Sequence, residues 1–146
     1  MKVLTFDIAT RTGWAFKQHK DDEADYGAFK LTTWSSYYKE AKELIDLYAP
    51  DVILCAEATR FHNPMKRMNM LTGIIALAAD KKGLKLYTKK RKNKKATGFP
   101  IDSEMKKAVF GRGKVSKQEI CERYNTSDED AADAMMFLEF YYITEG

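Results

Sequence analysis

The sequence predicts an α/β fold in which helices flank one mixed five-stranded sheet. Residues 3–8, 14–17 and 24–31 are short strand-like runs separated by turn residues, as at the start of an antiparallel sheet. From residue 36 onward, helical periodicity alternates with short apolar runs, as in strand–helix–strand units. The chain shows no internal repeat and no linker, so we expect one domain over residues 1–146 with a single core.

The later helices and strands follow from their apolar patterns. Residues 52–56 form a continuous apolar run typical of a buried strand, and residues 84–87 are the last expected strand. A helix over residues 64–82 separates them, with Gly83 as its C-terminal cap. An earlier helix ends at Pro50 and has one apolar face, formed by Tyr37, Ala41, Leu44, Ile45 and Tyr48.

The last third of the chain is predicted to be helical. Asp102 or Ser103 caps a short helix. The next helix starts at a capping box formed by Ser116 and Glu119. A final helix runs from about residue 127 to about residue 142.

The composition argues against several classes of protein. Hydrophobic residues make up 45% of the chain and charged residues 32%, which is typical of a globular domain. No apolar run approaches the roughly 20 residues that span a bilayer, and the first residues lack the long apolar region of a signal peptide. We therefore expect a cytoplasmic protein without membrane contacts. Cys55 and Cys121 lie far apart with no CxxC pattern, which argues against a zinc site.

Positive charge is concentrated in one segment. The net charge is +4, and residues 89–95 carry six positive charges, so the rest of the chain carries −2. Such a cluster is typical of a contact with a polyanion, and with a nucleic acid it would contact phosphates without reading sequence. The alternative is a solvated flexible loop over residues 89–100. The candidate DNA-binding residues are Lys89, Lys90, Arg91, Lys92, Lys94 and Lys95.

Two acids end buried strands. Asp7 follows the apolar run at residues 3–6 and precedes a glycine-containing turn, and Glu57 ends the run at residues 52–56. Isolated buried carboxylates are unfavourable unless they are paired or bound to a metal. Adjacent strands would place both acids at one rim of the sheet. Read singly, Asp7 is also compatible with a structural role, and Glu57 with a surface acid at a strand end.

Two further acids lie in the final helix. Asp130 and Asp133 are three residues apart and share a helix face, and the alanines between them allow a close approach to the sheet. Together with Asp7 and Glu57 they form a set of hard oxygen ligands that suits two Mg²⁺ or Mn²⁺ ions. Two such ions about 4 Å apart support phosphodiester cleavage. Asp128 and Glu129 are explained by the helix dipole alone.

These motifs resemble those of RuvC-type Holliday junction resolvases, especially phage-encoded ones. Residues 6–15 (FDIATRTGWA) resemble the opening motif of that family, and Glu57 matches its second acidic motif. Residues 105–113 with Lys117 resemble its lysine-bearing segment, and residues 130–134 resemble its closing motif. The resemblance implies a ribonuclease H-like fold, a homodimer, and paired metal-dependent nicks across a four-way DNA junction. In a phage-encoded protein this activity is expected in the host cytoplasm.

The resemblance also implies roles for single residues. It makes Asp7, Glu57, Asp130 and Asp133 the metal-binding catalytic acids, with Mg²⁺ as cofactor and Mn²⁺ as a possible substitute. Lys106 and Lys117 match the basic residues near the scissile phosphate, although both are also compatible with ordinary surface lysines. The turn after Asp7 is one residue shorter than in the cellular enzymes, Ala9 replaces their usual glycine, and residues 89–95 resemble an insertion, so the strong cleavage-sequence preference of the bacterial enzymes is not assumed here.

Further contacts with DNA and with a second copy are expected around this site. Phe61 follows Glu57 closely, and it either stacks on an unpaired base or packs over the next helix. Arg60, Lys107, Arg112 and Lys114 are the other candidate DNA contacts. One stripe of the helix over residues 64–82 is either core or the dimer face implied by the resemblance, and it consists of Met65, Met68, Leu71, Ile75 and Ala79.

Two other functions fit the same residues. A ribonuclease H-like hydrolase of RNA in hybrids, or a general flap and branch nuclease, would share the fold and the four acids. A non-catalytic module that binds branched DNA would share the fold, but it would have no need of the complete acidic set.

Overall fold

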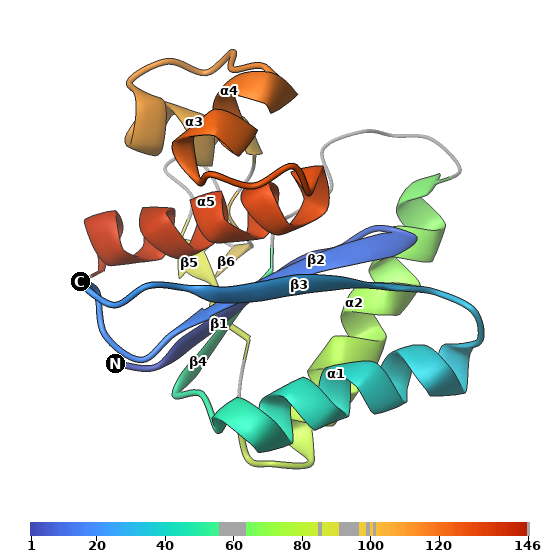
Figure 1. Cartoon of the computed structure of the whole chain (residues 1–146). Helices are drawn as coiled ribbons and strands as arrows, with labels where there is room; N and C mark the ends of the chain where they lie inside the picture. Colours follow the sequence, from blue (N-terminus) through green and yellow to red (C-terminus); the bar gives the residue numbers. More distant parts are fainter. Residues whose placement is uncertain (56–63, 85, 91–96, 99, 101, 146) are drawn as a thin grey trace.

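The sheet of the computed structural model is mixed and centres on the first strand (Figure 1). Its order is β3-β2-β1-β4, with β1 at Val3–Asp7, β2 at Arg11–Lys17, β3 at Asp25–Lys30 and β4 at Val52–Cys55. The pairs β1–β2 and β2–β3 are antiparallel, whereas β1–β4 is parallel. The predicted antiparallel start and mixed sheet are therefore confirmed. The structure describes residues 1–55, 64–84, 86–90, 97–98, 100 and 102–145.

The fifth strand expected over residues 84–87 is not shown. Among the described residues of this segment, only Leu86 forms a bridge, which is parallel to Ile53. The N–H of Leu84 instead donates to the carbonyl of Ala79 at 3.0 Å, as part of the turn that closes the preceding helix at Gly83. Two short strands within the expected loop, β5 (Lys89–Lys90) and β6 (Thr97–Gly98), pair separately as a small antiparallel ribbon.

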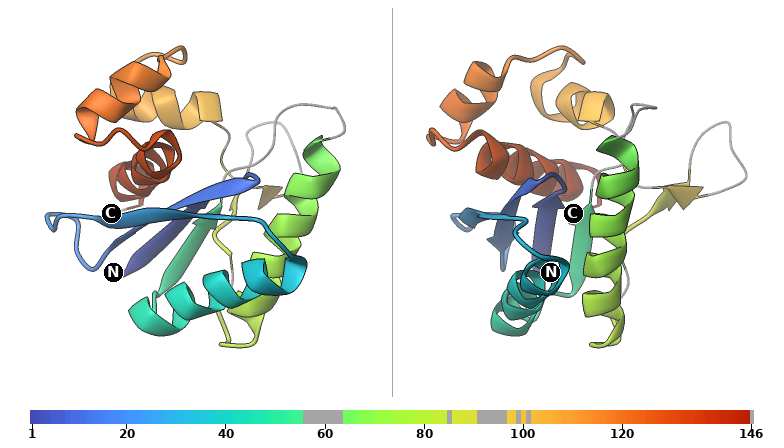
Figure 2. Two further views of the ribbon diagram at one scale, coloured as in Figure 1. Left: turned by 45° about the vertical axis from the view of Figure 1, so that its right-hand side comes forward. Right: turned by 90° about the vertical axis from the view of Figure 1, so that its right-hand side faces the viewer.

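Helices cover both faces of the sheet (Figure 2). Two helices, α1 and α2, lie on one face, and α5 lies on the other with α3 and α4 outside it. None of the helices in the described residues combines the length and the apolar character of a membrane span. The bounds are α1 at Trp34–Tyr48, α2 at Pro64–Asp80, α3 at Asp102–Phe110, α4 at Lys117–Arg123 and α5 at Glu129–Thr144.

Local patterns explain where the helices begin and end. Ser116 and Glu119 form the predicted capping box at the start of α4. Thr33 and Ser36 form another at the start of α1, which was not anticipated from the sequence. This helix ends at Ala49, whose φ of 44° stops the helical path just before Pro50.

The side chains of the central strand β1 point alternately to the two faces of the sheet, and the core is divided into one cluster on each face. Val3 packs into the cluster on the side of α5, whereas Leu4 and Phe6 pack into the cluster on the side of α1 and α2. Thr5 points to the α5 side, where its hydroxyl donates to the carbonyl of Ala134 at 2.7 Å. Because side chains in a strand alternate with period two, Asp7 also lies on the α5 side.

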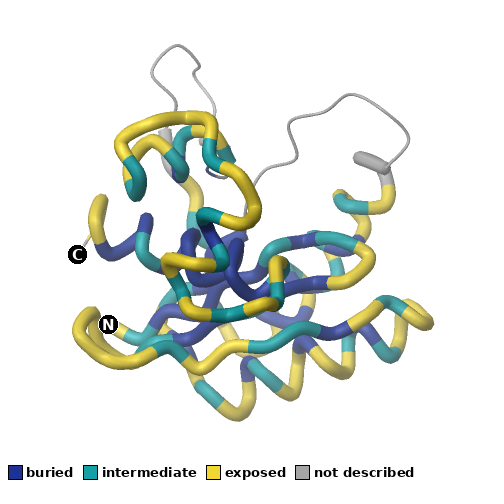
Figure 3. Tube along the Cα trace, turned by 45° about the horizontal axis from the view of Figure 1, so that its top comes forward, coloured by how far each residue is buried: buried dark blue, intermediate teal, exposed yellow. Residues whose placement is uncertain are grey.

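Helix α5 packs unusually close to the sheet. A Cβ atom added to Gly13 of β2 would lie 1.9 Å from the carbonyl oxygen of Asp130, so only glycine fits at that position. Ala131, Ala132 and Ala134 have no exposed surface, as expected from their small size. Figure 3 shows the buried residues gathered in the sheet and in α5, with exposed residues on the outer helices. This approach brings the acids of α5 to the end of β1.

Candidate active site

Asp7 and Asp133 come together where β1 ends beneath α5. Asp7 is the last residue of β1, and Asp133 lies in the second turn of α5 with only 5% of its surface exposed. Burial raises the pKa of Asp7 well above its ordinary value, and the negative charge of Asp133 raises it further. Asp7 is half-buried and Asp133 is buried, and two such neighbouring carboxylates repel each other unless a cation or a proton separates their charges. The pair is therefore suited to a cation.

Lys117 provides one positive charge at this pair. Its Nζ lies 2.5 Å from Oδ2 of Asp133. Burial acts to lower the pKa of Lys117, but the hydrogen bond to Asp133 and the charges of Asp133 and Asp7 outweigh it and raise that pKa. The pKa of Asp133 is nevertheless raised, because its burial outweighs the effect of Lys117. Within the described part of the chain, Oδ1 of Asp133 is buried and has no hydrogen-bond partner.

Asp130 faces a different cation. Its Oδ2 lies 2.7 Å from Nη1 of Arg11, which also lies 2.7 Å from Oδ1 of Asp128. The guanidinium lowers the pKa of Asp128 to about 2. The charge of Asp130 also contributes to the raised pKa of Asp7, so Asp130 lies within electrostatic reach of the Asp7–Asp133 pair. The sequence did not single out Arg11, because its partners lie 117 and 119 positions away along the chain.

Lys106 is held near the site by an acid that was expected only to cap a helix. Its Nζ lies 2.7 Å from Oδ2 of Asp102, one turn earlier in α3. The charge of Asp102 acts on Asp7, Asp133 and Lys117, which places Asp102 near all three. Nothing in the local sequence distinguishes this role from ordinary capping.

The donor chemistry of this cluster fits a hard divalent cation. Carboxylate oxygens are the ligands that Mg²⁺ and Mn²⁺ prefer, and none of the described residues donates a hydrogen bond to the buried Oδ1 of Asp133. The described residues alone include no group of three His, Cys, Asp or Glu side chains placed to hold a metal. Glu57, the fourth acid of the predicted set, lies outside the described residues.

The candidate DNA contacts have different surroundings. Lys107 and Lys114 are exposed, whereas Arg112 is bound to Glu119 and to the carbonyl of Lys114. Lys89 and Lys90 belong to β5, the first strand of the small ribbon. The remaining candidates lie outside the described residues, and they are Arg60, Phe61, Arg91, Lys92, Lys94 and Lys95.

The described part of the predicted stripe on α2 belongs to the core, and the side chain of Met65 lies outside the described residues. Leu71, Ile75 and Ala79 are buried with at most 1% of their surface exposed, and Met68 is partly buried against them. Their burial against the rest of the core excludes them as a dimer face. Among the described side chains of α2, the large exposed apolar ones are Met70, at 54% exposure, and Leu77, at 51%.

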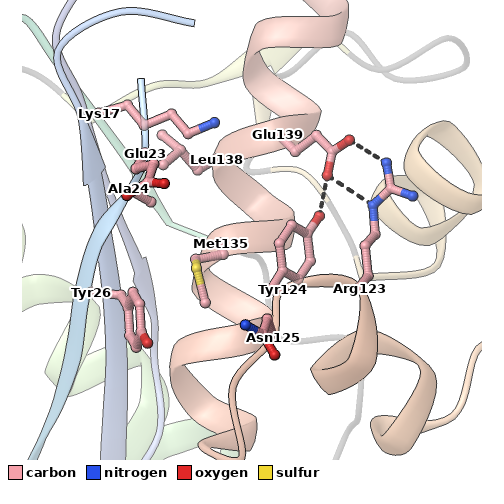
Figure 4. Close-up of a pocket in the computed structure, with 10 residues that line it drawn as sticks. All are labelled: Lys17, Glu23, Ala24, Tyr26, Arg123, Tyr124, Asn125, Met135, Leu138 and Glu139. Carbon is pink, nitrogen blue, oxygen red and sulfur yellow. Dashed lines mark hydrogen bonds and ion pairs between the residues drawn. The ribbon is translucent and has the colours of Figure 1, made fainter. Parts of the chain in front are cut away.

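A surface pocket lies away from these acids (Figure 4). It has a volume of about 410 Å³ and is lined by residues of the β2–β3 hairpin and of α4 and α5, including Lys17 and Tyr26. One of its two carboxylates among the described residues, Glu139, is engaged by Arg123 and by the hydroxyl of Tyr124, as the dashed lines show. None of the predicted catalytic residues lines this pocket.

Solved structures match this architecture, although no known protein family and no curated protein matches the chain. RuvC of Thermus thermophilus matches with a TM-score of 0.72 at 15% sequence identity, over 98% of this chain and 94% of that chain. The chain has the ribonuclease H-like fold of RuvC-type resolvases. The predicted fold class is confirmed, with four strands described in the main sheet rather than five.

Two other resolvases share this fold. The yeast mitochondrial Holliday junction resolvase Ydc2 matches with a TM-score of 0.58 at 15% identity, over 97% of this chain and 78% of that chain. The Fowlpox virus resolvase, solved with substrate Holliday junction DNA, matches with a TM-score of 0.52 at 14% identity, over 98% and 97%. Thermus thermophilus RuvC has also been solved in complex with its Holliday junction substrate.

Proposed function

We propose that this protein is a metal-dependent endonuclease that resolves Holliday junctions by paired phosphodiester cleavage. The observation that carries the proposal is the pair of half-buried Asp7 and buried Asp133, with Lys117 beside it and, among the described residues, no hydrogen-bond partner for Oδ1 of Asp133. The chain that carries this pair shares its fold with several Holliday junction resolvases.

Each residue of the site has a proposed role. Asp7, Glu57, Asp130 and Asp133 hold Mg²⁺, for which Mn²⁺ can substitute. The chemistry supplied by such ions is activation of water and stabilisation of the leaving oxygen. Lys117 neutralises Asp133 and lies close enough to the acids to bind a phosphate that enters the site. Lys106, anchored by Asp102, is the second phosphate contact.

Junction DNA is proposed to lie over the outer helices and the basic ribbon. Lys107 and Lys114 present exposed charges near Lys106 and Lys117 in sequence. The positive segment at residues 89–95 extends this charge along the chain. Contacts of this kind hold phosphates and carry no sequence information, so selectivity comes from the shape of the junction.

Paired cleavage requires two active sites, and we propose a homodimer that contacts through α2. Met70 and Leu77 are seven residues apart and therefore lie on one face of the helix, with exposed Gly73 between them. Large exposed apolar side chains on one helix face are typical of a contact with another chain. Each protomer then delivers one nick.

The decisive experiment compares substrates with Mg²⁺ or Mn²⁺ present. We expect cleavage of a four-way junction in preference to a flap, linear duplex DNA and an RNA–DNA hybrid. Asp7→Asn abolishes cleavage and leaves junction binding largely intact. Preferential cleavage of the hybrid or the flap favours the related nucleases on this fold, and binding without any cleavage by the wild-type chain favours a non-catalytic module.

A further inference from the structure

Arg11 is the first residue of β2, and its side chain contacts the start of α5. Its Nη1 and Nη2 contact Oδ1 and Oδ2 of Asp128 at 2.7 and 2.8 Å, which is a two-pronged contact. The same Nη1 contacts Oδ2 of Asp130 at 2.7 Å. One guanidinium therefore connects a proposed metal ligand with a residue that is not in the proposed ligand set.

Asp128 binds the guanidinium of Arg11 and also caps the start of α5. Its Oδ1 accepts hydrogen bonds from the backbone N–H groups of Asp130 and Ala131 at 3.1 and 3.2 Å, so Asp128 is the cap of α5. The backbone of Asp130 is also held against Gly13, whose strand partner is Asp7. Asp130 is thus fixed at its backbone by Gly13 and at its side chain by Arg11.

We propose that Arg11 is a positioning residue for the metal centre, held by Asp128 and aiming the carboxylate of Asp130. This inference rests on the proposed function. Arg11 contacts only Oδ2 of Asp130 and leaves Oδ1 for a cation. Hydrogen-bond partners that orient metal ligands in this way typically change metal affinity by about 10–100-fold when removed.

The opposite effect, competition between Arg11 and a metal for Asp130, is disfavoured by the contacts. Arg11 makes two contacts with Asp128 and one with Asp130, so Asp128 is the main partner of its charge. A competing guanidinium would instead be expected to place its paired contacts on Asp130. Positioning therefore predicts weaker metal binding when Arg11 is removed, whereas competition predicts tighter binding.

The test is a calorimetric titration of the full chain with Mn²⁺ alone, without DNA. We expect Arg11→Ala to weaken Mn²⁺ binding by about 10–100-fold, and Arg11→Lys to recover part of the loss because it keeps the charge without the planar fork. Arg123→Ala is the matched control. Arg123 of α4 makes a similar paired contact with Glu139 of α5, away from the acids of the site. Removal of the Arg123 side chain therefore leaves Mn²⁺ affinity unchanged.

A second variant tests the same inference if Arg11→Ala fails to fold. Asp128→Ser keeps a hydroxyl that caps α5 but removes the fork that holds Arg11, so it also weakens Mn²⁺ binding. Unchanged or tighter Mn²⁺ binding in either Arg11→Ala or Asp128→Ser overturns the inference and leaves the proposed function intact. A wild-type chain that binds no Mn²⁺ overturns the proposed function and this inference with it.

Discussion

Lys117 and Asp133 form an ion pair that links the first residue of α4 to the second turn of α5, with a separation of 2.5 Å between Nζ and Oδ2. The two side chains differ greatly in exposure, at 56% for Lys117 and 7% for Asp133. The lysine can therefore move toward solvent or DNA, whereas the carboxylate cannot. Removing the lysine leaves a buried charge without its partner.

Lys117→Met is expected to destabilise the metal-free protein by about 1 kcal/mol, because an unpaired buried acceptor is unfavourable and the exposure of the lysine limits the effect. Thermal unfolding of the Lys117→Met and wild-type proteins measures this loss of stability. The double variant with Asp133→Asn should recover most of the stability. Lys39→Met is the control, because Lys39 and Glu43 form an exposed pair 3.9 Å apart whose removal is expected to change the stability by less than about 0.5 kcal/mol. Equal effects of both lysine variants would contradict the prediction.

Asp7→Asn is expected to raise the melting temperature of the metal-free protein at neutral pH while it abolishes cleavage. The raised pKa of Asp7 means that the folded state holds its proton more tightly than the unfolded chain does. Stability therefore falls as the pH rises from the ordinary carboxyl range toward the folded pKa, and the full penalty applies above that pKa. The difference in melting temperature between Asp7→Asn and wild type should be small near pH 4 and should grow toward neutral pH. A difference independent of pH would refute this explanation.

Gly13→Ala is expected to displace α5 from the sheet, because the new Cβ would lie 1.9 Å from the carbonyl oxygen of Asp130. A destabilisation of at least about 1–3 kcal/mol is typical of such overpacking, and junction cleavage should fall with it. Gly73→Ala is the control. Gly73 lies in α2 with no atom within 4 Å of its added Cβ, so alanine should stabilise that helix by up to about 1 kcal/mol. A stable and active Gly13→Ala protein would show that this close packing is not needed.

Replacing the basic residues of the segment at residues 89–95 with glutamine is expected to weaken junction binding and to flatten its dependence on salt. For each phosphate that is no longer neutralised, the slope of log affinity against log salt should become shallower by about 0.9. Binding measured between low and moderate salt tests this. Glutamine replacements at Lys39 and Lys42 on α1, on the face of the sheet opposite α5, serve as the control. An unchanged slope in the basic-segment variant would exclude phosphate binding by this segment.

Charged substitutions at Met70 and Leu77 are expected to convert the proposed dimer to a monomer without unfolding it. Both side chains are more than half exposed, so a single protomer does not depend on them for its core. Sedimentation velocity of Met70→Lys with Leu77→Glu measures the change. Leu47→Lys on α1 is the control, since Leu47 is even more exposed, at 72%. A wild-type chain that sediments only as a monomer at assay concentrations would argue against the dimer.

Several features could be predicted because they depend on local patterns. The capping box at the start of α4 needs only Ser116 and Glu119, which lie within one helical turn, and the strand ending at Asp7 needs only the apolar character of its neighbours. The segment after Gly83 was predicted as a full strand, which the described residues do not show. Its apolar residues satisfy the strand pattern, but the end of α2 uses the N–H of Leu84. Apolar composition does not reveal which backbone groups are already engaged.

The sequence by itself determined the first four strands, the helices and the four candidate acids Asp7, Glu57, Asp130 and Asp133, because periodicity and strand-end position are local properties of the chain. Only the tertiary structure decided which cation each acid meets. Asp133 meets Lys117, and Asp130 meets Arg11. The physical reason is the close packing of α5 over Gly13, which brings Arg11 within hydrogen-bond distance of a residue 119 positions away.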